Sequence, residues 1–201
     1  MKLKNDLITK VIEIEGGYVN HPADRGGPTK YGITEKVARA FGYQGDMEVL
    51  PKSEAIEIYD KNYWQRLGLD GINDPELCFY IFDFGVNSGT RTAGLLLQKI
   101  FNELSGGNLT EDGVIGPVTQ AAINNYNNLE NLKLAYYCRR GDRFLRIVAS
   151  DPSQRVFIQG WLNRLRKIAN IGGRPEPVVE EFNLRDAVYL LVERLLDKLE
   201  K

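Results

Sequence analysis

Two carboxyl side chains near the N-terminus have a spacing that could support acid catalysis. Glu15 stands at the end of an apolar helical pattern, directly before Gly16-Gly17, and Asp24 follows nine residues later in the segment "PADRGG". We expect Glu15 to be buried in the apolar stripe and Asp24 to be exposed and ionised between flanking turns. Such pairs cleave glycosidic bonds, because one carboxyl protonates the leaving oxygen while the other stabilises the oxocarbenium ion or activates water.

The helical position of Glu15 favours the role of the acid. Glu15 falls in the same sector as Ile8 and Val11, whereas Glu13 points to the opposite side. Burying a carboxylate is costly, and the negative end of the helix dipole lies at the same place, so both effects favour a protonated carboxyl. Two simpler roles stay open: Glu15 could accept hydrogen bonds from the glycine loop's backbone amides, and Asp24 could be a turn former.

Other polar and aromatic residues could complete a sugar-binding site. Thr29 could position a water molecule with its hydroxyl, or be an ordinary loop residue. Asp83 and Asn87 are four residues apart, so they share one face of an otherwise apolar helix. They form either a buried hydrogen-bond network or the floor of a sugar cleft, with Asn87 the better candidate for substrate contact. Four aromatic residues could stack on sugars or belong to the core: Tyr18, Tyr31, Tyr63 and Trp64.

Hydrophobic periodicity predicts helices on both sides of a glycine-rich loop. We expect a helix over about residues 3–15, short β segments from Tyr18 to Ile33, and a helix through Phe41 that Thr34 caps. Asp74-Pro75 should begin an apolar central helix. Further helices are expected over about 53–67, 90–104, 119–125, 129–148, 153–170 and 183–201. The fold class is therefore mainly α, with a small β-rich loop region after the first helix.

The composition excludes several classes of protein. With 201 residues, of which 43% are hydrophobic and 26% charged, the chain can form one sizeable core or two small domains that share one. A net charge of −1 argues against a dedicated nucleic-acid binder. No apolar run approaches the ~20 residues of a membrane span. The first residues also lack the apolar core of a signal peptide.

Histidine and cysteine are too rare for common metal or triad chemistry. Because His21 is the single histidine and no CxxC motif occurs, we expect neither a zinc site nor a Ser-His-Asp hydrolase. Cys78 and Cys138 should be buried free thiols, with a disulfide as the alternative. Over residues 139–174, nine basic residues stand against two acidic ones. This excess is either a solvated helix surface or a patch that attracts an anionic polymer.

The glycine-rich loop carries a family resemblance. Residues 15–34, with the pattern E-G-G-Y-x-N-x-P-x-D-x-G-G-P-T-x-x-G-I-T, resemble the signature of glycoside hydrolase family 108. Its members are lysozyme-like N-acetylmuramidases of prophage lysis cassettes and secretion systems, and some are called secretion activators. "EAIEIYDKNYW" (54–64) and "FDFGVNSG" (82–89) resemble later blocks of that catalytic region. The resemblance implies a lysozyme-like fold and Glu15 as the catalytic acid.

The same loop is similar to the Glu–Asp–Thr triad of phage lysozymes. In that comparison Glu15, Asp24 and Thr29 are the three members, although the second gap is one residue shorter here. Downstream, "DGVIGPVTQAAI" (112–123) and "GWLNRLRKIA" (160–169) resemble the predicted peptidoglycan-binding region that usually follows. This second region could bind the cell wall or only complete the lysozyme fold.

The implied organisation has three parts. A lysozyme-like catalytic region covers residues 1–91, a peptidoglycan-binding helical region covers 92–170, and a linker with a C-terminal amphipathic helix covers 171–201. Catalytic residues are expected to be Glu15, Asp24 and Thr29. Substrate contacts are expected from Asn87, Asp83, Tyr18, Tyr31 and Asn20. No metal or cofactor is implied.

The predicted function is that of a peptidoglycan hydrolase. It would be an N-acetylmuramidase that cleaves the β-1,4 bond between N-acetylmuramic acid and N-acetylglucosamine, with peptidoglycan glycan strands as its partner. Made in the bacterial cytoplasm, it would reach the periplasmic wall through a holin, a secretion machine or lysis. Two rival functions are a lytic transglycosylase, which needs only one Glu, and a non-catalytic wall-binding secretion accessory protein.

Overall fold

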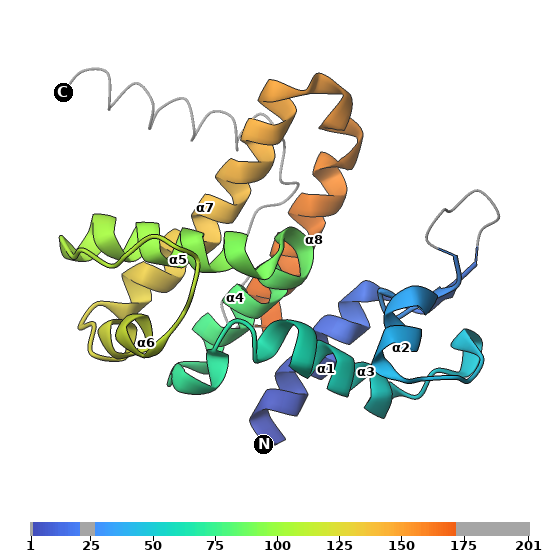
Figure 1. Cartoon of the computed structure of the whole chain (residues 1–201). Coiled ribbons are helices and arrows are strands. Elements are labelled where there is room, and N and C mark those ends of the chain that lie inside the picture. The colour runs from blue at the N-terminus through green and yellow to red at the C-terminus, as the bar shows by residue number, and fades with distance from the viewer. Residues whose placement is uncertain (1, 21–26, 172–201) are drawn as a thin grey trace. The chain divides into compact units, whose positions relative to one another are not determined.

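A computed structural model describes residues 2–20 and 27–171 of the chain (Figure 1). The chain up to Leu165 forms one compact unit, and Arg166 begins a second. The expected mainly α, lysozyme-like fold with a small sheet after the first helix is confirmed. Asp24, His21 and the helix expected over 183–201 lie outside the described residues.

Within those residues, helices form most of the structure. The α-helices are α1 (Lys2–Glu15), α2 (Glu35–Phe41), α3 (Lys52–Tyr59), α4 (Pro75–Ser88), α5 (Thr90–Ser105), α6 (Pro117–Asn124), α7 (Leu129–Ser150) and α8 (Ile158–Ile171). Short 3₁₀ turns are η1 (Met47–Val49), η3 (Leu69–Gly71) and η4 (Pro152–Phe157), and η2 (Asp60–Trp64) is a π-helical turn. The strands are β1 (Tyr18–Val19), β2 (Thr29–Lys30) and β3 (Ile33–Thr34).

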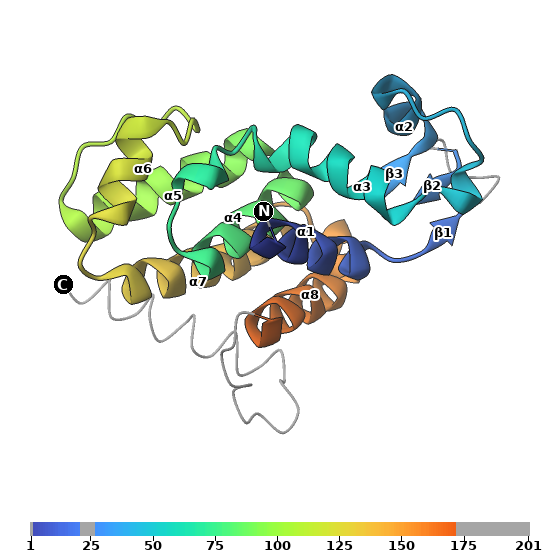
Figure 2. The same cartoon turned by 90° about the horizontal axis from the view of Figure 1, so that it is seen from below.

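The three strands form an antiparallel sheet in the order β1-β2-β3. Tyr18 pairs with Lys30, and Lys30 pairs with Ile33. In the first unit, the sheet and α2 lie at one end and α6 at the other (Figure 2). The predicted cap of α2 is confirmed, since the Thr34 side chain accepts a hydrogen bond from the Val37 amide.

Helix α4 is the centre of the first unit. It packs against α1, α5, α7 and η2, and its residues from Leu77 to Gly85 are all buried. This burial explains why its sequence is apolar on nearly every side. The predicted start is also confirmed, because the Asp74 carboxylate accepts a hydrogen bond from the Leu77 amide at 2.7 Å and Pro75 is the first helical residue.

Two ion pairs hold α7 alongside α4. Lys133 contacts Glu76 at 2.7 Å, and Arg140 pairs with Asp83. The partners are seven residues apart on each helix, so α4 and α7 run side by side in the same direction. All of α7 belongs to the second region expected from sequence, so this packing joins both regions within one compact unit.

The helix expected over 53–67 is interrupted by a π-helical turn. The Gln65 amide donates to the Asp60 carbonyl, five residues back. In a regular α-helix, side chains five residues apart point about 140° away from each other. The wider turn brings Tyr59 and Trp64 together, so that both rings contact Phe82, with centroids 6.3 and 5.4 Å away. Aromatic packing on α4 thus overrides the α-helical pattern.

The "DGVIGP" motif is a tight turn held by Gln98 of α5. The buried Gln98 side chain donates to the Asp112 carboxylate and the Val114 carbonyl, and its oxygen accepts from the Gly113 amide. The Asp112 carboxylate also accepts a hydrogen bond from the Val114 amide. The bond from Gln98, and then the bond from the Val114 amide, hold the pKa of Asp112 below its ordinary value. Pro117 then begins α6, as the sequence predicts.

Neither cysteine forms a disulfide within the described residues, and the expected burial is confirmed for Cys78 alone. Cys78 is buried, and burial followed by the nearby carboxylates of Asp74 and Asp70 raises the pKa of its thiol to about 12. Cys138 is only half-buried. Among the described helices, none combines the length and apolarity of a bilayer-spanning segment.

Helix α5 approaches the "DGVIGP" turn so closely that a larger residue at Gly94 should destabilise the fold. A β-carbon added at Gly94 would lie 2.2 Å from the Gly113 carbonyl oxygen. We expect Gly94→Ala to lower the free energy of unfolding by about 1–3 kcal/mol, since the backbone must shift. Gly160→Ala is the matched control, because a β-carbon there meets nothing within 4 Å on helix α8. The control should stabilise by about 0.5–1 kcal/mol in urea unfolding. Equal effects of the two substitutions would contradict the close approach.

Candidate active site

Glu15 is the last residue of α1, as the sequence predicts. The helix stops because Gly16 takes a left-handed conformation with φ of 93°. Ile8 and Val11 on the same side are fully buried, but the Glu15 side chain keeps 21% of its surface exposed. Its Oε1 atom accepts a hydrogen bond from Nη2 of Arg164 at 2.7 Å. The carboxyl is therefore held by a cation rather than enclosed by apolar core.

The β2–β3 hairpin places its backbone directly against Glu15. Tyr31 and Gly32 form a two-residue turn in which both φ angles are positive, 53° and 71°. This conformation is unusual for tyrosine, and the Tyr59 hydroxyl fixes it by donating to the Tyr31 carbonyl at 2.8 Å. A β-carbon at Gly32 would lie 3.1 Å from Glu15 Oε2 and 2.9 Å from the Tyr59 hydroxyl. Only glycine leaves this space open.

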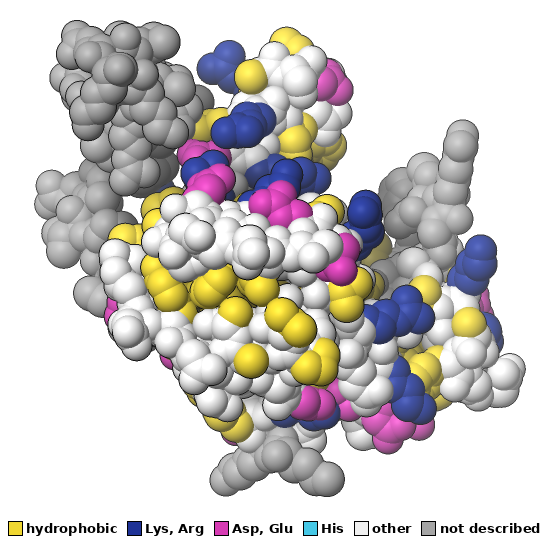
Figure 3. Space-filling model, turned by 60° about the vertical axis from the view of Figure 1, so that its left-hand side comes forward, with side chains coloured by type: hydrophobic (Ala, Val, Ile, Leu, Met, Phe, Trp, Pro, Cys, Tyr) yellow, Lys and Arg dark blue, Asp and Glu magenta, His cyan; other side chains and the backbone are white. Residues whose placement is uncertain are grey.

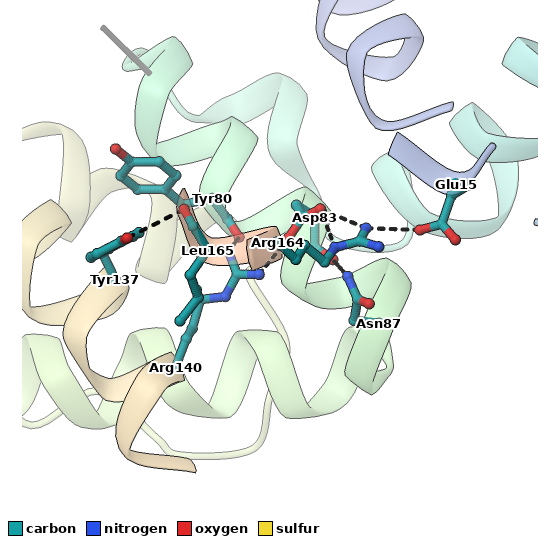
Figure 4. Close-up of polar contacts among 8 residues, drawn as sticks. All are labelled: Glu15, Tyr80, Asp83, Asn87, Tyr137, Arg140, Arg164 and Leu165. Atoms are coloured by element: carbon teal, nitrogen blue, oxygen red, sulfur yellow. Dashed lines mark hydrogen bonds and ion pairs between the residues drawn. The ribbon is translucent and has the colours of Figure 1, made fainter. Parts of the chain in front are cut away.

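Arg164 joins Glu15 to the buried carboxylate of Asp83 (Figure 4). Its Nη2 and Nε atoms donate to Asp83 Oδ1 at 2.7 and 3.1 Å. The other carboxylate oxygen, Oδ2, accepts from Nη2 of Arg140. Arg140 also donates to the Tyr80 carbonyl at 3.3 Å, and its guanidinium lies 5.1 Å from the centre of the Phe84 ring. One buried anion therefore holds two guanidinium groups in place.

The charges of this cluster shift several pKa values. Burial lowers the pKa of Arg164, but the charges of Asp83 and Glu15 and their hydrogen bonds outweigh it, so the pKa lies above its ordinary value. Burial, and then the charge of Glu15, raise the pKa of Tyr59 and of Tyr63. Arg164 therefore stays charged, and both tyrosines keep their hydroxyl protons at neutral pH.

Asp83 and Asn87 share one face of α4, as expected, but lie at different depths. Asp83 is fully buried, so it can act on the site only through the arginines it binds. Asn87 is exposed, and its side-chain amide donates to the Asp83 carbonyl at 2.7 Å. Its side-chain oxygen accepts no hydrogen bond from the described residues. Of the two, Asn87 is the side chain that could contact a sugar.

The remaining predicted site residues lie on the sheet or outside the described chain. The Thr29 hydroxyl donates to the Gly27 carbonyl at 3.1 Å, and no contact among the described residues joins it to Glu15. Tyr18 is half-buried on β1, and Asn20 is exposed just after that strand. Asp24 is not among the described residues, so its distance from Glu15 stays a prediction.

Arg164 and Arg140 do not appear among the residues expected to form the site. Arg164 lies 149 positions from Glu15, and no local pattern connects the two. A signal is nevertheless present, because Arg140 sits at helical spacing between the aromatic residues Tyr136 and Phe144, where an apolar residue is expected. A cation in an apolar stripe indicates a buried anion. The sequence does not say that this anion is Asp83.

Comparison with known proteins supports the same two regions. Residues 8–89 match the family model described as Glycosyl hydrolase 108. The resemblance to glycoside hydrolase family 108 is confirmed. Residues 92–166 match the model described as Predicted Peptidoglycan domain, so the glycosyl hydrolase 108 region supplies Glu15 and Asp83 while the peptidoglycan domain supplies Arg140 and Arg164.

A solved structure is similar over most of the chain. The structure of SagA from Brucella abortus matches with a TM-score of 0.64 at 26% sequence identity, over 84% of this chain and 92% of SagA. No curated protein matches the sequence. The glycosyl hydrolase 108 region and the peptidoglycan domain together indicate a peptidoglycan-related glycoside hydrolase.

Because Asp83 forms two buried ion pairs, its substitution should lower the stability of the fold strongly. Asp83→Asn keeps the side-chain shape but leaves two guanidinium groups without their anion, so it should lower the free energy of unfolding by about 3–5 kcal/mol. The control is Glu13→Gln, which removes the exposed pair with Lys52 and should change stability by less than about 1 kcal/mol. Urea unfolding of the two variants measures the difference. A small loss at Asp83 would show that the buried pairs do not hold the regions together.

Proposed function

We propose that this protein hydrolyses the β-1,4 bond between N-acetylmuramic acid and N-acetylglucosamine in peptidoglycan, with Glu15 as the general acid. The observation that carries the proposal is the position of Glu15, at the end of α1, against the Tyr31–Gly32 turn and held by Arg164. The match to Glycosyl hydrolase 108 over residues 8–89 and the peptidoglycan domain after it support the substrate class.

The two oxygens of Glu15 have different surroundings, which suits proton donation. Oε1 accepts from Arg164, whereas Oε2 accepts no hydrogen bond from the described residues. In the proposed step the protonated form of Glu15 gives its proton from Oε2 to the glycosidic oxygen as the bond to the anomeric carbon breaks. Negative charge then develops on Glu15 next to the Arg164 guanidinium. Arg164 thus stabilises the carboxylate most when the proton has left.

Asp24 is proposed as the second carboxyl group. It would stabilise the oxocarbenium ion as a nucleophile, with retention of the anomeric configuration, or activate water, with inversion. Asp83 does not serve this role, because it is fully buried and binds two arginines. If Asp24 is dispensable, Glu15 alone remains at the site, and a lytic transglycosylase becomes the second candidate function.

Muropeptide analysis of digested sacculi tests whether Glu15 is the general acid. Glu15→Gln should lower turnover by about 10²–10⁴-fold, because a carboxamide cannot donate the proton. Glu13→Gln, two residues earlier and exposed on the same helix, is the matched control and should keep full activity. Similar new reducing muramic-acid ends from wild type and Glu15→Gln would refute Glu15 as the acid.

The same digests separate the rival functions. Anhydromuramic-acid ends from the wild type, together with full activity of Asp24→Asn, would assign a lytic transglycosylase. Pelleting with sacculi without any cleavage by the wild type would assign a wall-binding accessory protein. Reducing ends that disappear in both carboxyl variants support the hydrolase.

Arg164 is proposed as a positioning residue for Glu15. Arg164→Met should lower kcat about 100-fold with little change in KM, because a displaced carboxyl transfers its proton poorly. Arg164→Lys keeps the charge but loses the planar fork that contacts Asp83 and Glu15 together. It should therefore recover part of the loss. Steady-state kinetics measure both variants, and an unchanged kcat in Arg164→Met would exclude this role.

A further inference from the structure

A second concave surface lies away from Glu15, between α5 and α7. This groove has a volume of about 550 Å³ and is lined almost entirely by the peptidoglycan domain. Its apolar part comes mainly from Phe84, Leu95, Leu96, Ile100 and Ile147. Nothing in the chemistry proposed for Glu15 uses this groove. It is large enough to take a short peptide or a few sugar units.

The rim of the groove carries an excess of positive charge. Arg139 and Glu103 form an ion pair of 2.6 Å that neutralises both. The other charged lining residues are Lys99, Asp142, Arg143 and Arg146, and none of the three basic ones forms an ion pair within the described ranges. Lys99, Arg143 and Arg146 are also exposed. Three free cations against one carboxylate leave a net positive rim.

The exposed face shown in Figure 3 brings the same kinds of side chain together. Dark blue basic side chains gather there with magenta acidic ones, beside yellow hydrophobic ones. Apolar contact and unpaired guanidinium groups in one groove suit a ligand with small apolar groups and several carboxylates. A neutral glycan matches only part of this surface, because it has no carboxylates to pair with the arginines.

We propose that this groove binds the acidic stem peptide of peptidoglycan. A stem peptide combines free carboxylates with the methyl groups of alanine residues. The carboxylates would pair with Arg143 and Arg146, whose planar guanidinium groups bind such anions in a bidentate manner. The methyl groups would lie on the floor formed by Leu95 and Ile147. The proposal rests on the proposed function only in taking peptidoglycan as the ligand.

The groove shares a structural support with the Glu15 site. Phe84 lines the groove, directly follows Asp83 in sequence and contacts Arg140. The buried ion pairs that fix Arg164 at Glu15 therefore also fix one wall of the groove. Both sites belong to the same compact unit of the chain.

The test is a binding measurement that separates peptide from sugar. Every variant carries Glu15→Gln so that the ligand is not cleaved. The probes are the soluble disaccharide tetrapeptide of peptidoglycan and the neutral disaccharide of N-acetylglucosamine, which carries neither peptide nor carboxylate. We expect Arg143→Glu with Arg146→Glu to weaken binding of the peptide-bearing probe about tenfold, because attraction becomes repulsion. Titration calorimetry at low and high salt measures the affinities, and high salt should reduce the difference.

A matched control carries the same change in net charge outside the groove. Lys36→Glu with Arg155→Glu reverses two exposed charges on α2 and η4 and should change affinity by less than about twofold, since neither residue lines the groove. Thermal unfolding should be alike in both double variants, because all four residues are exposed. A groove variant that unfolds early is replaced by Arg143→Gln with Arg146→Gln, for which a smaller loss of the same direction is expected.

Three outcomes would overturn the proposal. One is equal affinity of the groove variant and the control for the peptide-bearing probe. Another is equal affinity of the unaltered groove for the two probes. The third is a change of oligomeric state in the groove variant, which would assign the groove to a second copy of the chain. Product analysis of Glu15→Gln tests the hydrolase separately, so failure of one proposal does not imply failure of the other.

Discussion

The buried carboxylate of Asp83 is the constraint on which the rest of the structure depends. It lies on the central helix α4 and binds Arg140 from α7 and Arg164 from α8. Burying one anion with two cations is favourable only when each charge keeps its partner. Removing Asp83 leaves two guanidinium groups without their anion, so this one carboxylate links the three helices. Through Arg164 the same set fixes Glu15 at the end of α1.

Because of this constraint, a residue of the peptidoglycan domain helps to hold the proposed catalytic residue of the glycosyl hydrolase 108 region. Arg164 comes from the former and reaches a carboxyl of the latter, 149 residues earlier. The sequence left open whether the second region binds wall or completes the fold. The contacts of Arg140 and Arg164 show that it completes the surroundings of Glu15. The groove between α5 and α7 is a separate surface of the same region.

Features that depend on neighbouring residues could be predicted from the sequence. The end of α1 at Gly16, the Thr34 cap and the start of α4 at Pro75 each follow from one residue and its backbone preference. The placement of Glu15 at a helix end was predictable for the same reason. The π-helical turn at Asp60–Trp64 was not, because it follows from packing of two rings on α4. Arg164 was missed because an ion pair leaves no periodic signal at such separation.

The burial of Cys78 protects one thiol of the core from oxidation. Cys78 is buried, and its thiol is weakly hydrogen-bonded to the carbonyls of Leu69 and Ile72. With a pKa near 12 it carries almost no thiolate at neutral pH, and oxidants attack the thiolate. Because no disulfide joins Cys78 to Cys138, the packing around Cys78 should stay the same when a reducing agent is added.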